Sequence, residues 1–137
     1  MTIPFDDARA FVEIAFQVKS YDVDYNRHVH NLVYIRWLED LRLGLMDKYF
    51  PLDKFLALGL SPVLLRTSIE YRKPIRLFEP VLGRMWIAGS SRVRFEFVAE
   101  FRVGDAVAAL AEQTGAIVDI TTGRPVRTPA EFLAAIA

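Results

Sequence analysis

Apolar and polar residues alternate one by one near the start of the chain. In residues 11–21, apolar positions such as Phe16 are followed by polar ones such as Gln17. A period of two with one polar face is typical of a β-strand. We expect this strand to end at residues 22–27, which are rich in turn-forming side chains, and residues 1–10 to form a weakly structured leader.

From about Asn31 to Tyr49 the spacing of the apolar residues changes to that of an α-helix. They recur every three or four positions, and few charged residues interrupt a nearly apolar circumference. Such a helix is not an ordinary surface helix, so we expect a sheet to wrap around it. Residues 50–51 should end the helix, because proline cannot continue one. Asn26, or the pair His30 and Asn31, is predicted to cap its start.

Four strand-like runs follow a short amphipathic segment, residues 52–60. They are Val63–Arg72, Val81–Gly89, Arg92–Val103 and Ala106–Ile120. Antiparallel strands joined by short turns can cover one apolar helix. The order therefore predicts an α+β fold with an antiparallel five-stranded sheet around a long central helix. Residues 128–137 are predicted to form a short helix, with Thr128 as N-cap, Pro129 in the first turn and Glu131 in the reciprocal capping position.

Size and composition narrow the class of protein. A chain of 137 residues is expected to be one domain, residues 1–137. Equal numbers of basic and acidic residues, 17 of each, give no electrostatic footprint for nucleic acid. The absence of cysteine excludes disulfides and cysteine nucleophiles, and two histidines spaced i, i+2 do not favour a metal site. No apolar run approaches the roughly 18 residues of a membrane span, so a soluble, cytoplasmic protein is expected.

Short polar or ionisable side chains gather where the first strand meets the long helix. They are Asp22, Asp24, Asn26, His28, His30 and Asn31. The stretch resembles the Asp-x-Asp-x-x-Gly-His-Val-Asn-Asn-x-x-Tyr signature of hotdog-fold acyl-CoA thioesterases of the 4-hydroxybenzoyl-CoA thioesterase type. Here the signature reads Asp22, Asp24, Arg27, His28, Val29, His30, Asn31 and Tyr34. Residues 68–75 and 116–129 resemble later segments of that family, so the resemblance covers nearly the whole chain and implies a single hotdog domain.

The resemblance implies hydrolysis of an acyl-CoA thioester to free acid and coenzyme A, with no cofactor beyond the coenzyme A of the substrate. Asp24 matches the family's second Asp, which acts as general base or nucleophile. A backbone N–H near Asn31 is expected to polarise the thioester carbonyl, because the unpaired N–H groups of a helix start favour negative charge. The Asn31 side chain either orients water or caps the helix. Four further residues are expected to contact the substrate: His28, His30, Tyr34 and Glu39.

Two positions depart from the family pattern. The usual Gly is Arg27, which must accept a strained conformation if that Gly has a positive φ; otherwise the loop differs. The usual first Asn is His30, which could tune Asp24, bind substrate or only cap the helix. Glu39, two turns into the helix, is a second candidate carboxylate, and its simpler interpretation is an ion pair with a neighbouring arginine.

Coenzyme A carries phosphates, which need hydrogen-bond donors and cations. The turn before the fourth strand offers both, and the residues expected to bind the phosphates are Ser90, Ser91, Arg92 and Arg94. A plain hairpin with solvated charges is the alternative.

Assembly and two other functions complete the predictions. A hotdog domain leaves one sheet edge and one groove exposed, so a homodimer or homotetramer is expected. The resembling families place their sites at the dimer interface.

Two other functions remain open. One is a hotdog hydratase or dehydratase that uses Asp24 with His28 or His30, and the other is a non-catalytic acyl-CoA-binding module.

Overall fold

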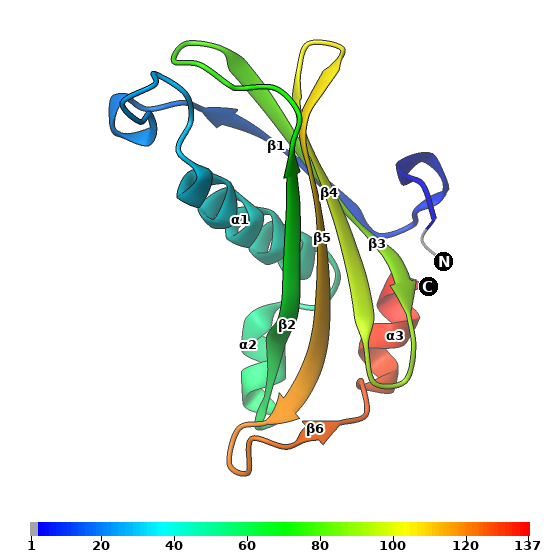
Figure 1. Ribbon diagram of the computed structural model, residues 1–137. Helices are drawn as coiled ribbons and strands as arrows, with labels where there is room; N and C mark the ends of the chain where they lie inside the picture. The colour runs from blue at the N-terminus through cyan, green and yellow to red at the C-terminus, as the bar shows by residue number, and fades with distance from the viewer. Residues whose placement is uncertain (1–2) are drawn as a thin grey trace.

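The computed structural model describes residues 3–137, which form one antiparallel sheet packed against one long helix (Figure 1). The helix is α1 (Asn31–Tyr49). The sheet has the strand order β1-β3-β4-β5-β2, with bounds β1 (Phe11–Gln17), β2 (Leu60–Tyr71), β3 (Pro80–Ser90), β4 (Phe95–Val103) and β5 (Ala106–Asp119). A short β6 (Pro125–Val126) pairs with β5 outside this order. The shorter helices are η1 (Phe5–Asp7), η2 (Ser20–Asp22), α2 (Leu52–Ala57) and α3 (Ala130–Ile136). The predicted hotdog fold is confirmed, with a sixth strand of two residues added.

The core lies between α1 and the sheet face that looks toward it. Alternation along β4 buries Phe95, Phe97 and Phe101 on this face. The Phe101 ring packs at 5.4 Å from Tyr34 and 5.7 Å from Trp37 of α1. Fully burying a large apolar side chain stabilises the fold by roughly 1.5–3 kcal/mol, so this layer holds the helix in place.

The opposite face of α1 is not covered within one chain. Leu32, Ile35 and Leu43 on that face remain 67%, 44% and 36% exposed. The nearly apolar circumference predicted a helix wrapped on most sides, and the sheet covers only one of them. The remaining apolar surface is therefore open to solvent or to another molecule.

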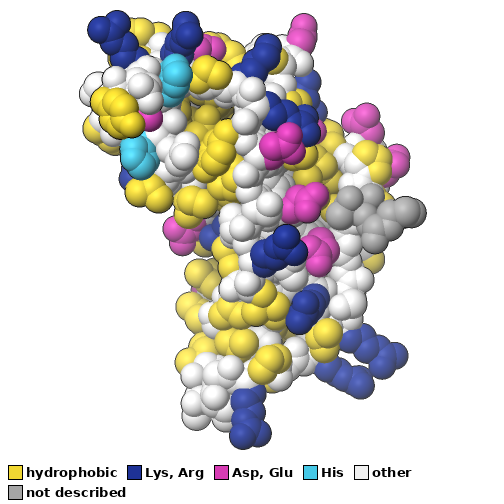
Figure 2. Space-filling model, viewed as in Figure 1, with side chains coloured by type: hydrophobic (Ala, Val, Ile, Leu, Met, Phe, Trp, Pro, Cys, Tyr) yellow, Lys and Arg dark blue, Asp and Glu magenta, His cyan; other side chains and the backbone are white. Residues whose placement is uncertain are grey.

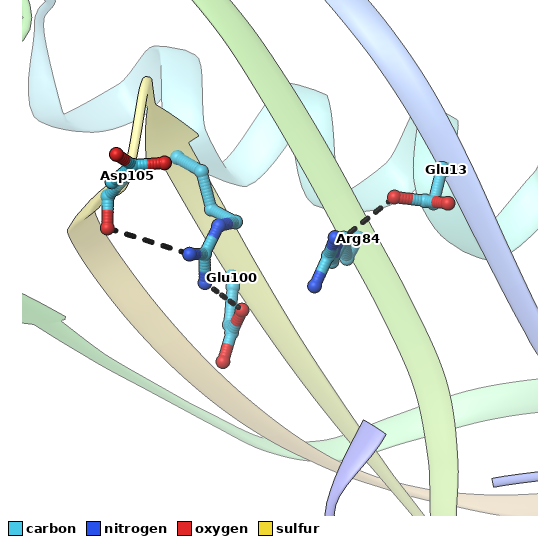
Figure 3. Close-up of polar contacts among 5 residues, drawn as sticks. Glu13, Arg84, Glu100 and Asp105 are labelled. Carbon is cyan, nitrogen blue, oxygen red and sulfur yellow. Dashed lines mark hydrogen bonds and ion pairs between the residues drawn. The ribbon is translucent and has the colours of Figure 1, made fainter. Parts of the chain in front are cut away.

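The outer face of the sheet carries paired charges (Figure 3). Arg84 on β3 donates to Glu13 on the neighbouring β1 at 2.9 Å, and the two residues are direct cross-strand partners. Arg102 donates to Glu100 at 3.0 Å and to the backbone carbonyl of Asp105 at 3.4 Å. The part of this face around these charges is therefore suited to water.

The start of the chain is better ordered than the sequence predicts. The indole N–H of Trp86 donates to the carbonyl of Ile3 at 2.9 Å, and Phe5 packs edge-on against Trp86 at 5.4 Å. The expectation of a weakly structured leader is wrong for residues 3–10. The reason is a small apolar patch on the outer sheet face that this segment covers.

The predicted strand bounds of the later sheet agree with the structure to within three residues. The first strand is shorter than predicted, because the backbone N–H of Lys19 donates to the Asp22 carboxylate at 2.8 Å and starts a 3-10 turn.

The predicted capping box of the last helix is wrong. The N-cap is Pro129, and the Thr128 hydroxyl is buried without a partner among residues 3–137. The Thr128 N–H donates to the carbonyl of Arg92 at 2.7 Å, which ties this segment to the β3–β4 turn instead. Glu131 lies in the first turn of α3, but its carboxylate pairs with Lys54 at 3.1 Å and does not cap the helix.

Candidate active site

Asp24 shapes the loop between β1 and α1 through its backbone and its side chain. Its N–H donates to the carbonyl of His28 at 2.8 Å, and its carbonyl accepts from Arg27 at 2.9 Å. Its Oδ1 accepts the backbone N–H of Asn26 at 2.8 Å and of His28 at 3.2 Å. An aspartate that bonds to the backbone two residues on is a common turn-forming device. The turn therefore fixes the position of the Asp24 carboxylate.

Arg27 occupies the position of the family's glycine and has a φ of +64°. This is the left-handed region, which costs a non-glycine residue roughly 1 kcal/mol. The loop therefore keeps the glycine-type conformation, and Arg27 accepts the strain while its side chain stays exposed.

Asp22 and Val29 attach this loop to the rest of the fold. Asp22 is 4% exposed, its carbonyl accepts the N–H of His30 at 2.8 Å, and its carboxylate lies 4.0 Å from Arg36. The N–H of Val29 donates to the carbonyl of Ile75 at 2.7 Å. These contacts give Asp22 the structural role that its turn-forming chemistry suggests.

The start of α1 has one capped and one free backbone donor. His30 is the N-cap, and its Nδ1 accepts the N–H of Leu32 at 3.1 Å. The N–H of Asn31 has no hydrogen-bond partner among residues 3–137. Because unpaired N–H groups at a helix start attract negative charge, the Asn31 peptide offers a site for an anionic oxygen.

A cavity of about 480 Å³ brings the loop, the helix start and the end of β2 together. We call it the carboxylate pocket; its walls include Asp24, His28, Asn31, Tyr34, Tyr71 and Lys73. The second carboxylate oxygen of Asp24, Oδ2, has no hydrogen bond to any atom of residues 3–137. Figure 2 shows both histidines at this end of the surface, beside apolar and basic side chains. The residue with the unpaired carboxylate oxygen and the residue with the unpaired backbone donor thus line the same cavity among residues 3–137.

Two tyrosines form one wall of the carboxylate pocket. The rings of Tyr34 and Tyr71 meet edge to face at 5.1 Å, and the Tyr71 hydroxyl donates to the carbonyl of Asn31 at 3.4 Å. Burial, with smaller contributions from Tyr71 and Glu79, raises the pKa of Tyr34 to about 12. Burial also raises the pKa of Tyr71. Both hydroxyls are therefore neutral hydrogen-bonding groups at pH 7.

Tyr71 and Lys73 were not among the residues predicted for the site. They follow Asn31 by about forty positions and reach it only because the end of β2 meets the start of α1. The resemblance of residues 68–75 to a family segment was the only signal, and it carried no role for a particular side chain.

Glu39 lies outside the carboxylate pocket. It lines a second cavity of about 360 Å³ with Arg42 and Met46 of α1. No ion pair of Glu39 within 4.0 Å is present among residues 3–137, so the expected pairing with a neighbouring arginine is at most a longer-range one. Burial lowers the pKa of Arg42, and the charge of Glu39 opposes this shift in part.

The residues predicted to bind phosphate lie at the far end of the sheet from Asp24. β3 starts near the end of β1 and runs for 11 residues to Ser90, which is roughly 35 Å for an extended strand. The Ser91 hydroxyl closes the turn by accepting the N–H groups of Val93 and Arg94 at 3.3 and 3.1 Å. Within one chain, Ser90, Ser91, Arg92 and Arg94 are therefore not brought together with the carboxylate pocket.

Comparison with known proteins identifies the family. The thioesterase-like superfamily matches residues 18–136. A curated relative from Aquifex aeolicus (strain VF5), named "Putative esterase", is 30% identical over 118 residues, which is 85% of this chain and 91% of that protein. The fold and the site define a hotdog protein with a loop carboxylate. The chain belongs to the thioesterase-like superfamily.

Solved structures share the fold at lower identity. The 1,4-dihydroxy-2-naphthoyl-CoA thioesterase Slr0204 from Synechocystis matches with a TM-score of 0.81 at 18% identity, covering 92% of this chain and 95% of that one. A Staphylococcus aureus protein solved in complex with CoA matches with a TM-score of 0.85 at 18% identity, covering 92% of this chain and 81% of that one.

Among residues 3–137, no helix is long and apolar enough to cross a membrane.

Proposed function

We propose that this protein hydrolyses an acyl-CoA thioester to a free acid and coenzyme A. The observation that carries the proposal is the carboxylate pocket, which Asp24 and Asn31 both line, while Oδ2 of Asp24 and the N–H of Asn31 have no hydrogen-bond partner among residues 3–137. Thioester hydrolysis needs a base or nucleophile on one side of the carbonyl and a donor for its oxygen on the other. The solved relatives that act on or bind CoA compounds support this choice of substrate.

Two routes use the same carboxylate. As general base, Asp24 takes a proton from water, the hydroxide oxygen attacks the carbonyl carbon, and the C–S bond breaks. The thiolate then takes the proton. As nucleophile, Asp24 attacks the carbonyl carbon, releases the thiolate and forms an anhydride that water hydrolyses. In both, the Asn31 N–H stabilises the negative charge that develops on the carbonyl oxygen.

The histidine contacts favour hydrolysis over hydration of a carbon–carbon double bond. A hydratase would pair an imidazole with Asp24 to move a proton at carbon. The His30 ring caps α1 through Nδ1, and the hydrogen bonds between His28 and Asp24 involve the His28 backbone. In our proposal, His28 and Tyr34 line the acyl site, and His30 positions the helix start.

Assembly is part of the proposal, because one chain separates the carboxylate from the cationic turn. The outer edge of β2 is unpaired among residues 3–137 and is 12 residues long. An exposed edge of this length is a template for pairing with a second chain. Two-fold pairing of β2 with β2 would bring the Asp24 end of one copy toward the end of the partner that carries Arg92 and Arg94. We propose that these arginines, with Ser90 and Ser91, bind the phosphates of a CoA whose thioester lies at Asp24 of the partner copy.

The experiment is a thiol-release screen across short, long and aromatic acyl-CoAs. Thiol appears at a rate proportional to enzyme if the protein is a hydrolase. Loss of enoyl absorbance without thiol would instead indicate a hydratase, and binding of CoA without either signal would indicate a binding module.

A further inference from the structure

One flank of α1 connects the two cavities. Its residues Asn31, Ile35, Arg42 and Met46 are spaced by four, seven and four positions, which places them on one side of a helix. Asn31 contacts β2 at Tyr71. Asn31 belongs to the carboxylate pocket, whereas Arg42 and Met46 line the second cavity. An acyl group that leaves Asp24 along this flank therefore runs toward the second cavity.

The second cavity is suited to a hydrocarbon chain. We call it the apolar groove; it lies between α1 and the start of β2, and its walls include Leu43, Met46, Leu52, Val63, Phe95 and Phe97. It shares no lining residue with the carboxylate pocket, so the two cavities are separate.

A hydrogen-bonded brace crosses the space between them. Arg42 of α1 donates to the side-chain oxygen of Gln113 on β5 at 2.9 Å, and the Gln113 amide donates to Thr67 on β2 at 3.1 Å. Gln113 is 2% exposed, so both ends of its amide are held inside the fold. The brace fixes the Arg42 guanidinium in the wall of the apolar groove, which Arg42 lines together with Glu39.

The guanidinium is an unfavourable neighbour for an alkyl chain. Burial lowers the pKa of Arg42, which remains a cation at neutral pH. No carboxylate lies within 4.0 Å of it among residues 3–137, so part of its hydrogen-bonding capacity is left to water. A chain passing this point would strip that water from a charged group, which is costly without a replacement partner.

We infer that Arg42, held by Gln113, is a specificity-determining residue that ends the acyl site and excludes long alkyl chains from the apolar groove. The inference rests on the proposed function, since it concerns the acyl group of the proposed substrate. The helix rises roughly 16 Å between Asn31 and Arg42, and the arginine side chain leans back toward the helix start. The preferred substrates are therefore short and medium-chain acyl-CoAs.

Calorimetric binding of S-butyl-, S-octyl- and S-hexadecyl-CoA tests the inference without turnover, because these thioethers cannot be hydrolysed. Each methylene that becomes buried tightens binding roughly fourfold. The wild type should gain affinity from butyl to octyl and then stay within about threefold for hexadecyl. Arg42→Ala should bind hexadecyl at least tenfold more tightly than octyl, with butyl nearly unchanged.

Two further variants control for folding and charge. Arg42→Lys keeps a cation. Its affinity should therefore also stop rising beyond the octyl thioether, a pattern we call the octyl plateau. Arg42→Ala with Gln113→Leu removes the whole buried amide contact, so no unpaired amide remains, and it should behave like Arg42→Ala. Three results would overturn the inference. The wild type could bind S-hexadecyl-CoA tenfold more tightly than S-octyl-CoA, or Arg42→Ala could lose the same affinity for all three thioethers. The third is that no thioether binds at all.

Thiol release from butanoyl-, octanoyl- and palmitoyl-CoA separates this inference from the proposed function. An intact octyl plateau without any thiol release rejects the hydrolase and retains the role of Arg42 in binding. Thiol release that continues to rise through palmitoyl-CoA retains the hydrolase and rejects the role of Arg42.

Discussion

Asp24 and His28 are hydrogen-bonded to each other twice. The N–H of Asp24 donates to the carbonyl of His28 at 2.8 Å, and the N–H of His28 donates to Oδ1 of Asp24 at 3.2 Å. One carboxylate oxygen therefore holds the turn while the other has no partner among residues 3–137. The same side chain can organise the loop and supply chemistry.

The strain at Arg27 gives a prediction about stability. Arg27→Gly should raise the free energy of unfolding by about 1 kcal/mol or less, because glycine relieves the φ of +64° but adds entropy to the unfolded chain. Arg27→Ala is the control: it removes the guanidinium, keeps the strain and should bring no gain. Urea unfolding of the three proteins measures both effects. If Arg27→Ala were also more stable than the wild type, the gain in Arg27→Gly would come from removal of the charge and not from relief of backbone strain.

Tyr34 gives a prediction about alkaline stability. Its pKa is about 12 in the folded protein and about 10 in the unfolded chain, so between these values the folded state holds a proton that the unfolded state has lost. The contribution of protonated Tyr34 to the free energy of unfolding is fully present below pH 10 and is lost as the pH rises toward 12. Urea unfolding between pH 8 and 11 should show the wild type losing more stability than Tyr34→Phe. Parallel curves for the two proteins would contradict this.

The edge of β2 gives a prediction about assembly. Light scattering should find a dimer or tetramer, and Leu65→Lys should shift it toward monomer, because lysine on an edge strand opposes edge pairing. Leu58→Lys is matched in exposure, 58% against 52% for Leu65, but lies outside the strand and should leave the mass unchanged. A wild type that is monomeric at every concentration would remove the shared-site proposal.

Arg92 gives a prediction about substrate recognition. Arg92→Ala should raise KM for acyl-CoA more than it lowers kcat, because contacts far from the thioester mostly contribute uniform binding. A short acyl-pantetheine thioester lacks the nucleotide and should be affected much less. Arg127→Ala, another exposed arginine, is the control. Equal effects of Arg92→Ala on both substrates would place Arg92 outside the nucleotide site.

The sequence predicted the fold well because its signals are local. Periods of two and 3.6 are properties of neighbouring residues, and they located α1 and the later strands to within three residues. The misses occur where a distant contact decides. Thr128 has the chemistry of an N-cap, but its backbone is bonded to Arg92, and the helix begins one residue later.

The candidate site was predictable only in its contiguous part. Asp24, His28 and Asn31 are neighbours in sequence and share one cavity. Tyr71 lines that cavity because the end of β2 meets the start of α1, and Arg92 lies far from it because β3 runs away from Asp24. Both outcomes depend on strand pairing and direction, which the residue pattern of a single segment does not specify.

The most direct test of the account is kcat for Asp24→Asn with the best substrate of the thiol-release screen. Asparagine keeps an oxygen that can accept the N–H groups of Asn26 and His28, so the turn should survive while the negative charge is lost. We predict that kcat falls by roughly 100-fold or more, with acyl-CoA binding and stability little changed. Glu39→Gln, in the separate groove, should keep most activity. Full activity in Asp24→Asn, or its loss only in Glu39→Gln, would contradict the assignment of the chemistry to the loop carboxylate.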